Sequence, residues 1–125
     1  MSFRQFDAGP DPFGRKYKVL LKWLQTAISI RHADTVDVKF ILEDDAGATS
    51  EKTIALPHAE LLAASKSTTR PMDDAWCGRI AAMHLVHLIE TGEDMEKDLV
   101  TLSKAEVLAY AQQVVEAEKQ ALRVA

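Results

Sequence analysis

Residues 35–43, TVDVKFILE, carry the pattern that decides the fold. Every second side chain is apolar and most of the others are charged, which is typical of a strand with one buried face. The apolar set is Val36, Val38, Phe40 and Leu42. A turn-forming segment, DDAG at residues 44–47, follows, and residues 52–56 alternate again. We therefore predict an antiparallel β-hairpin.

The predicted hairpin needs further elements packed against it, because two strands alone are marginally stable in water. It must therefore pack on helices or join a larger sheet. Within one chain, both outer edges of the hairpin would be unpaired. Pairing with a second copy across a two-fold axis would cover one of these edges.

Residues 13–31, which precede the hairpin, are predicted to form a long helix. Apolar side chains recur at the i, i+3, i+4, i+7 spacing of a helix: Tyr17, Leu20, Leu21, Leu24 and Ile28. Four neighbours widen this stripe to an arc of about 200°: Val19, Trp23, Ala27 and Ile30. A helix on one surface needs about half of that arc. We therefore expect this helix to lie between two layers or against another chain.

Residues 1–14 are predicted to form an N-terminal arm. Two glycines and two prolines between residues 9 and 14 oppose regular structure. Yet the arm holds Phe3, Phe6 and Phe13, three of the four phenylalanines in the chain. Two interpretations stay open: these rings pack on the protein's own body, or the arm docks on a second subunit or another partner.

The candidate partner-binding residues combine this arm with the apolar and basic sides of the helix predicted at residues 13–31. They are Phe3, Phe6, Phe13, Val19, Trp23, Ile30, Arg15, Lys18 and Lys22. The basic members could bind an acidic partner, including DNA. Two alternatives stay open: this charged helix face is simply solvated, or it docks on the acidic stretch at residues 90–98 of a second copy.

Three further helices are predicted after the hairpin. A short one covers residues 57–66 and has a proline in its first turn. A longer one covers residues 72–91 and stops at Gly92, since glycine suits the left-handed position after a helix end. The last begins with a capping box, in which Ser103 and Glu106 each bond the backbone of the other.

The last helix carries two apolar series with a seven-residue period, which suit packing along another long helix. They are Val107/Val114/Ala121 and Leu108/Val115/Leu122. The predicted fold class is α+β and predominantly helical. About four helices, one of them short, pack on one face of a two-stranded antiparallel β-hairpin in the order α-β-β-α-α-α. Residues 15–125 form a single domain after the arm.

The helix predicted at residues 72–91 holds the candidates for a metal or cofactor site. His84 and His87 are three residues apart, so their rings lie about 60° apart around the helix axis and could bind one ion. Glu90 continues the same spiral as a third candidate ligand. In the competing interpretation, His84 is a hydrogen-bonded core residue among apolar neighbours.

Composition excludes several classes of protein. With 15 basic and 19 acidic side chains among 125 residues, the net charge of −4 argues against a general nucleic-acid binder. Cys77 is the only cysteine, so no internal disulfide forms. No apolar run could span a bilayer, and the N-terminus does not look like a secretory signal. No phosphate-loop or hydrolase motif is present. We therefore expect a cytoplasmic protein without a cofactor.

The leading functional hypothesis is a small, non-enzymatic accessory or regulatory protein that acts through protein–protein contacts as a homodimer. The wide apolar arc, the arm and the unpaired hairpin edges support it. One alternative is a metal- or cofactor-binding protein that uses His84 and His87. Another is a regulator that contacts DNA through the basic face of the helix at residues 13–31.

Overall fold

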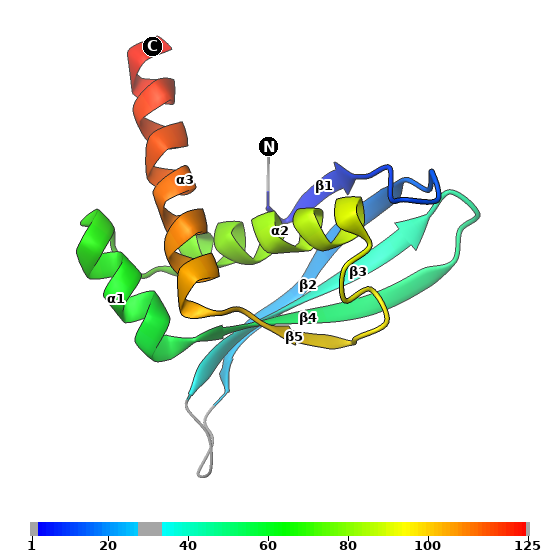
Figure 1. Ribbon diagram of the computed structural model, residues 1–125, viewed down its shortest axis with the longest axis horizontal. Helices are drawn as coiled ribbons and strands as arrows, with labels where there is room; N and C mark the ends of the chain where they lie inside the picture. Colours follow the sequence, from blue (N-terminus) through cyan, green and yellow to red (C-terminus); the bar gives the residue numbers. More distant parts are fainter. Residues whose placement is uncertain (1–2, 28–33, 125) are drawn as a thin grey trace.

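The computed structural model describes residues 3–27 and 34–124, which form two layers (Figure 1). Within these residues, one layer is a five-stranded sheet in the order β1-β2-β3-β4-β5. Its strands are β1 (Gln5–Ala8), β2 (Tyr17–Ala27), β3 (Thr35–Asp44), β4 (Thr49–Pro57) and β5 (Leu99–Thr101). The first four form an antiparallel meander, and β5 lies parallel to β4.

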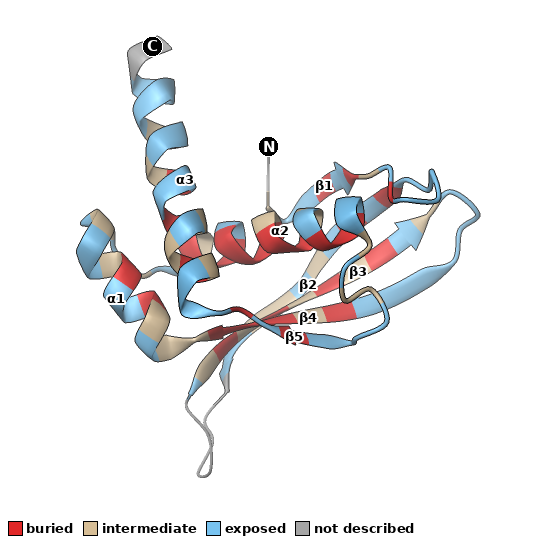
Figure 2. Cartoon of the chain, viewed as in Figure 1, coloured by how far each residue is buried: buried red, intermediate tan, exposed pale blue. Residues whose placement is uncertain are grey.

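The other layer consists of the helices α1 (His58–Thr68), α2 (Asp74–Thr91) and α3 (Lys104–Val124). In Figure 1, α2 lies across the sheet, α1 stands beyond the end of β4, and α3 rises away from both. The core lies between α2 and the sheet, and Figure 2 shows α2 buried along most of its length. Within the described residues, no helix has both the length and the apolar character needed to cross a membrane.

The α+β class is confirmed, but the predicted predominance of helix is wrong. The described residues form a five-stranded sheet and three helices, not a two-stranded hairpin with four helices. The order is β-β-β-β-α-α-β-α rather than α-β-β-α-α-α. The largest error concerns residues 13–31, which contain β2 instead of a helix. Positions 28–31 of that segment lie outside the described residues.

A β-bulge explains why β2 resembles a helix in sequence. Up to Leu21 the strand alternates between the two faces of the sheet. The pairing with β3 then shifts between Leu21 and Trp23, which inserts one extra residue. As a result, Leu21 and Leu24 both lie opposite buried residues of β3, namely Phe40 and Val38. Two apolar residues three positions apart thus share a face, as they would in a helix.

The hairpin predicted from residues 35–56 is present as β3 and β4, and other strands pair with its outer edges, along β3 but only over three residues of β4. β2 pairs with β3 along its length, and β5 pairs with residues 53–55 of β4. The edge of β3 therefore no longer supports association with a second copy. The outermost strands of the sheet are β1 and β5.

The N-terminal segment contributes a strand to the sheet. β1 pairs with residues 17–20 of β2. Phe6 in β1 is buried, and its ring meets the ring of Phe40 edge-on with 6.1 Å between centroids. The part of the predicted arm that forms β1 therefore packs on the body of the same chain.

Asp11 orders the connection from β1 to β2. Its carboxylate accepts hydrogen bonds from the backbone N–H groups of Phe13 and Arg15 and from the Tyr17 hydroxyl, each at 2.9 Å. The Arg15 side chain also donates to Asp11 at 2.9 Å. Burial by itself would raise the pKa of Asp11, but these hydrogen bonds outweigh burial and lower it to about 2. Arg15, a candidate partner-binding residue, thus bonds within its own loop.

Candidate functional site

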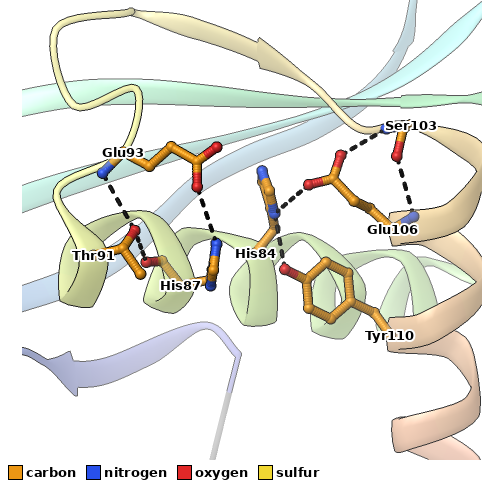
Figure 3. Close-up of polar contacts among 7 residues, drawn as sticks. All are labelled: His84, His87, Thr91, Glu93, Ser103, Glu106 and Tyr110. Carbon is orange, nitrogen blue, oxygen red and sulfur yellow. Dashed lines mark hydrogen bonds and ion pairs between the residues drawn. The ribbon is translucent and has the colours of Figure 1, made fainter.

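A polar cluster joins α2 to α3 (Figure 3). His84 on α2 is 3% exposed. Its Nδ1 atom lies 2.9 Å from the Tyr110 hydroxyl and 3.7 Å from a carboxylate oxygen of Glu106, both on α3. Figure 3 shows these two side chains converging on the same imidazole nitrogen. The cluster therefore ties the middle of α2 to the first turns of α3.

The capping box at the start of α3 holds Glu106 in this position. The Ser103 N–H donates to one Glu106 carboxylate oxygen at 2.9 Å, and the Glu106 N–H donates to Ser103 Oγ at 3.2 Å. This reciprocal pair confirms the capping box predicted from the sequence. The second carboxylate oxygen of Glu106 is the one that faces His84.

His87 forms the second half of the cluster, nearer the end of α2. Its Nε2 atom lies 3.2 Å from the carboxylate of Glu93, which follows the helix. The Thr91 hydroxyl donates to the His87 carbonyl at 2.7 Å and accepts from the Glu93 N–H at 3.2 Å. The rings of His84 and His87 are stacked, with 6.0 Å between centroids and 24° between planes.

The surroundings of His84 keep its imidazole uncharged at neutral pH. Burial lowers the pKa of His84 below its usual value, and this outweighs the nearby Glu106 carboxylate, which raises it. Burial likewise raises the pKa of Tyr110. The contact between the two side chains is therefore a hydrogen bond between neutral groups. Because the unfolded chain takes up the His84 proton first, stability falls as the pH drops below the unfolded pKa of about 6.5.

The metal-site hypothesis gains little from this geometry. His84 and His87 do come together, but Glu90 is exposed and stands outside the cluster. In addition, Nδ1 of His84 is engaged by Tyr110. Among residues 3–27 and 34–124, no group of three His, Cys, Asp or Glu side chains is arranged to hold a metal ion. Metal binding through His84, His87 and Glu90 stays a prediction.

Tyr110→Phe is expected to lower the free energy of unfolding at pH 7 by about 1–3 kcal/mol, because it leaves the buried Nδ1 of His84 without its neutral partner. The aromatic contact between the two rings, 5.6 Å between centroids, would remain. Urea denaturation of the two proteins measures the difference. Unchanged midpoints would mean that the hydrogen bond adds nothing to stability.

Cys77 does not look like a nucleophile in this environment. The residue is buried in α2. Burial, together with the charges of Asp74 and Asp73, raises the pKa of the thiol to about 12. The sulfur is therefore protonated at neutral pH, whereas nucleophilic cysteines react as thiolates.

The structure separates the residues predicted to bind a partner. Phe6 and Val19 are buried in the core of the same chain. Phe3 is half-buried against α2, where a Cβ atom added at Gly78 would come within 2.4 Å of its ring. Phe13, in the connection from β1 to β2, is 83% exposed. The three rings of the arm thus have three different environments.

The remaining candidates lie on β2 or beyond it. Lys18 is exposed, and Trp23 is half-buried on the sheet face opposite the helices. Lys22 donates to both carboxylate oxygens of Glu51, at 2.9 and 3.2 Å. Ile30 falls outside the described residues.

Two ion pairs lie on this open sheet face. Glu51 on β4 bridges Lys22 on β2 and Lys39 on β3, at 2.9 and 3.1 Å. The Lys39 ammonium also lies 5.5 Å from the centre of the Trp23 ring. These contacts satisfy the charges within one chain. The basic face was predicted on a helix, but this segment is a strand. DNA binding through Arg15, Lys18 and Lys22 stays a prediction.

A groove of about 470 Å³ runs between α2 and the C-terminal half of α3. Its apolar walls are formed by Phe3, Ala82, Met83, Val114, Ala117 and Ala121. At the rim, Arg79 pairs with Glu118 at 3.3 Å, and Arg70 pairs with the same carboxylate at 2.7 Å. These pairs hold α3 against the start of α2.

The α3 side of this groove could be predicted from the sequence, whereas the α2 side was not predicted. Val114 and Ala121 belong to the seven-residue series already noted on the last helix. Gly78 was a usable signal for the other side, because a glycine inside a helix costs about 1 kcal/mol relative to alanine and suggests a close approach. The group that approaches is the ring of Phe3.

Comparison with known proteins adds no assignment. No protein-family model matches the chain, and no curated protein or solved structure matches it either. The functional argument therefore depends on the geometry of the chain itself.

Proposed function

We propose that this chain is a non-enzymatic accessory or regulatory protein that acts through protein–protein contacts and forms a homodimer through α3. The observation that carries the proposal is the C-terminal half of α3. This 21-residue helix is about 31 Å long, and its last turns extend beyond the other elements (Figure 1). Residues 119–122 are exposed, and Figure 2 shows this part of the helix in pale blue.

Burial changes abruptly along α3. Val107, Ala111 and Val114 form its buried stripe, and each is at most 5% exposed. Ala121 continues the same stripe but is exposed, and the adjacent Leu122 is 79% exposed. Single exposed apolar residues are common on protein surfaces. Here, however, Ala121 follows Val107 and Val114 at the same seven-residue spacing, past the ion-paired Glu118, and is exposed among the described residues. A second helix would complete the packing of this side of α3.

A second copy of the chain supplies such a helix. Each copy presents both a projecting helix and, beside it, the apolar groove between α2 and α3. Across a two-fold axis, α3 of each copy enters the groove of the other, so that both contacts form together and close the dimer. Small side chains in the groove, such as Ala82 and Ala117, let two helices approach closely.

Other features favour a binding role over a catalytic one. His84 is buried and held by Tyr110, so its imidazole is not presented to a substrate. The raised pKa of Cys77, about 12, keeps its thiol protonated.

A single buried cysteine also suits a reducing compartment. On that ground we propose that the protein is cytoplasmic.

Ala121→Glu is expected to convert the dimer to a monomer, because it puts a carboxylate into the apolar contact without a partner. Gln112→Glu is the matched control. It adds the same charge to α3, nine residues away and therefore on the opposite side of the helix. Each new carboxylate also has one existing glutamate within a turn, Glu118 or Glu116.

Light scattering after gel filtration measures the mass of both variants. We expect a monomer for Ala121→Glu and a dimer for Gln112→Glu. Equal masses for the two variants would show that the groove side of α3 is not the contact surface.

A further inference from the structure

Three segments of the chain line the groove between α2 and α3. α2 contributes Ala82 and Met83, α3 contributes Ala117 and Ala121, and the segment before β1 contributes Phe3. Figure 1 shows the start of β1 beside α2, in agreement with the contact between Phe3 and that helix. A helix that enters the groove therefore meets the N-terminal segment as well as the two helices.

Gly78 provides the seat for the Phe3 ring on α2. It is the only glycine in α2, and it is buried. A Cβ atom at this position would have three atoms of the Phe3 ring as its nearest neighbours beyond the local backbone, two of them at 2.4 Å. Alanine favours a helix more than glycine does. The glycine thus weakens α2 on its own but lets the ring lie directly on the helix backbone.

Phe3 marks the boundary between the apolar groove and a charged part of the surface. The side chain is half-buried, and it also borders a smaller hollow of about 230 Å³ beside the outer edge of β2. Arg4, Lys22 and Asp74 line this hollow and make it more polar than the groove. The Arg4 guanidinium lies 5.0 Å from the centre of the Phe3 ring. The ring therefore gives the groove an apolar border where charged side chains begin.

The charges at the rim of the groove suit the α3 helix of a second copy. Arg70 and Arg79 share the single carboxylate of Glu118, which leaves one positive charge in excess among the three. On α3, Glu116 and Glu118 lie about 100° to either side of Ala117. Since Glu118 is engaged within its own chain, the exposed Glu116 is the carboxylate that α3 brings to Arg79 of the other copy.

We propose that the Phe3 ring of each copy contacts α3 of the other copy and holds it in the groove, which rests on the homodimer proposed above. The N-terminal segment is then part of the dimer interface and determines how tightly the two copies associate. Aromatic side chains are the apolar residues that most often dominate interface energies. Because the axis is two-fold, the contact forms twice in each dimer.

Phe3→Ala is expected to raise the dissociation constant of the dimer at least about tenfold, since two aromatic contacts are lost together. Phe13→Ala is the matched control. Phe13 is also an N-terminal phenylalanine with an arginine beside its ring, Arg15 at 5.5 Å, but it is 83% exposed in the connection from β1 to β2. Its dissociation constant should stay within about twofold of the native value.

Sedimentation equilibrium measures the three dissociation constants. Equal values for the native chain and Phe3→Ala would overturn the role of the ring. Equal weakening by Phe3→Ala and Phe13→Ala would overturn it too, because the effect would then not depend on the groove.

Gly78→Ala displaces the ring without removing it. Its Cβ atom would occupy the place of the Phe3 ring edge, whereas alanine by itself strengthens α2. The two variants thus act on α2 in different ways and on the ring in the same way. We expect Gly78→Ala to weaken the dimer as Phe3→Ala does. A dimer that is weakened by Phe3→Ala and unchanged by Gly78→Ala would contradict the seating of the ring as the cause.

Nuclear Overhauser contacts in a mixed dimer of the native sequence test the contact itself. One copy carries ¹³C and the other does not, so that isotope filtering selects contacts between copies. We expect cross-peaks between the Phe3 ring protons of one copy and the methyl groups of Ala117 or Ala121 of the other. A dimer in which the Phe3 ring shows contacts to its own chain alone would overturn the proposal.

The outcomes for the two proposals can be told apart. A native chain that is a monomer overturns the homodimer and, with it, the contact made by Phe3. A native dimer that Ala121→Glu dissociates, but whose dissociation constant Phe3→Ala leaves unchanged, supports the homodimer and overturns the role of Phe3 alone.

Discussion

Phe40→Ala is expected to lower the free energy of unfolding by about 3–5 kcal/mol, a large share of the roughly 5–15 kcal/mol that stabilises a typical domain. Phe40 is fully buried in the middle of β3, and its ring meets Phe6 of β1 edge-on. Truncation therefore leaves a cavity and removes a contact that holds β1 on the core. Urea denaturation at pH 7 measures the loss.

Ile41→Ala is the control for this prediction, because Ile41 is the next residue and lies half-buried on the opposite face of the sheet. Its truncation is expected to cost about 1 kcal/mol, the range over which strand residues differ at partly exposed positions. Adjacent residues point to opposite faces in a strand. Equal losses for the two variants would contradict the arrangement of one covered and one open face.

Lys52→Met is expected to lower the free energy of unfolding by about 2–4 kcal/mol, because it leaves backbone carbonyls without their charged donor. Lys52 is 4% exposed on β4. Its ammonium donates to the carbonyls of Asp94 at 2.9 Å and Met95 at 3.3 Å, and also to that of Lys97. These carbonyls belong to the loop that joins α2 to β5, so the loop should loosen and its amides should exchange faster.

Burial lowers the pKa of Lys52, although the nearby carboxylates of Asp98, Glu96 and Asp94 oppose this effect. Lys22→Met is the matched control, since Lys22 carries the same side chain on the open face and is exposed. Its pair with Glu51, at 2.9 Å, should contribute less than about 1 kcal/mol. A loss for Lys52→Met no larger than that of the control would mean that the loop does not depend on Lys52.

Local patterns in the sequence predict the elements whose residues interact with near neighbours. The alternation around Phe40 defines β3, and the spacing of Ser103 and Glu106 defines the start of α3. Gly92 ends α2 with a φ of 74°, in the left-handed region expected for that position. In each case the interaction that defines the element joins residues a few positions apart, so the local sequence is enough to predict it.

β2 could not be recognised in this way, because the bulge after Leu21 changes the phase of its alternation. The apolar arc of about 200° on the helical wheel argued against a helix, since a helix on one surface needs an arc about half as wide. A strand with one covered face and several apolar residues on the other face produces the same pattern. Leu20, which is 49% exposed, and Trp23 are two such residues.

The short outer strands depend on contacts that are distant in sequence. β5 has 3 residues and joins β4 in parallel only after two helices intervene. β1 lies in a segment whose glycines and prolines argue against regular structure, and its pairing with β2 keeps it in place. Neither strand is long enough to show a period of its own.

The candidate site also depends on contacts between residues that are distant in sequence. The interpretation of His84 as a hydrogen-bonded core residue agrees with the structure, but its partner Tyr110 lies 26 residues further along the chain. The groove between α2 and α3 likewise needs Phe3 from the N-terminal segment. A single sequence contains no record of which distant residues meet.

The mass of the native chain in solution tests the central claim most directly. At about 100 µM, well above a micromolar dissociation constant, light scattering should give twice the 13.9 kDa of one chain. Dilution into the nanomolar range should reduce this value toward a single chain. A mass of 13.9 kDa at the highest concentration would contradict self-association through α3.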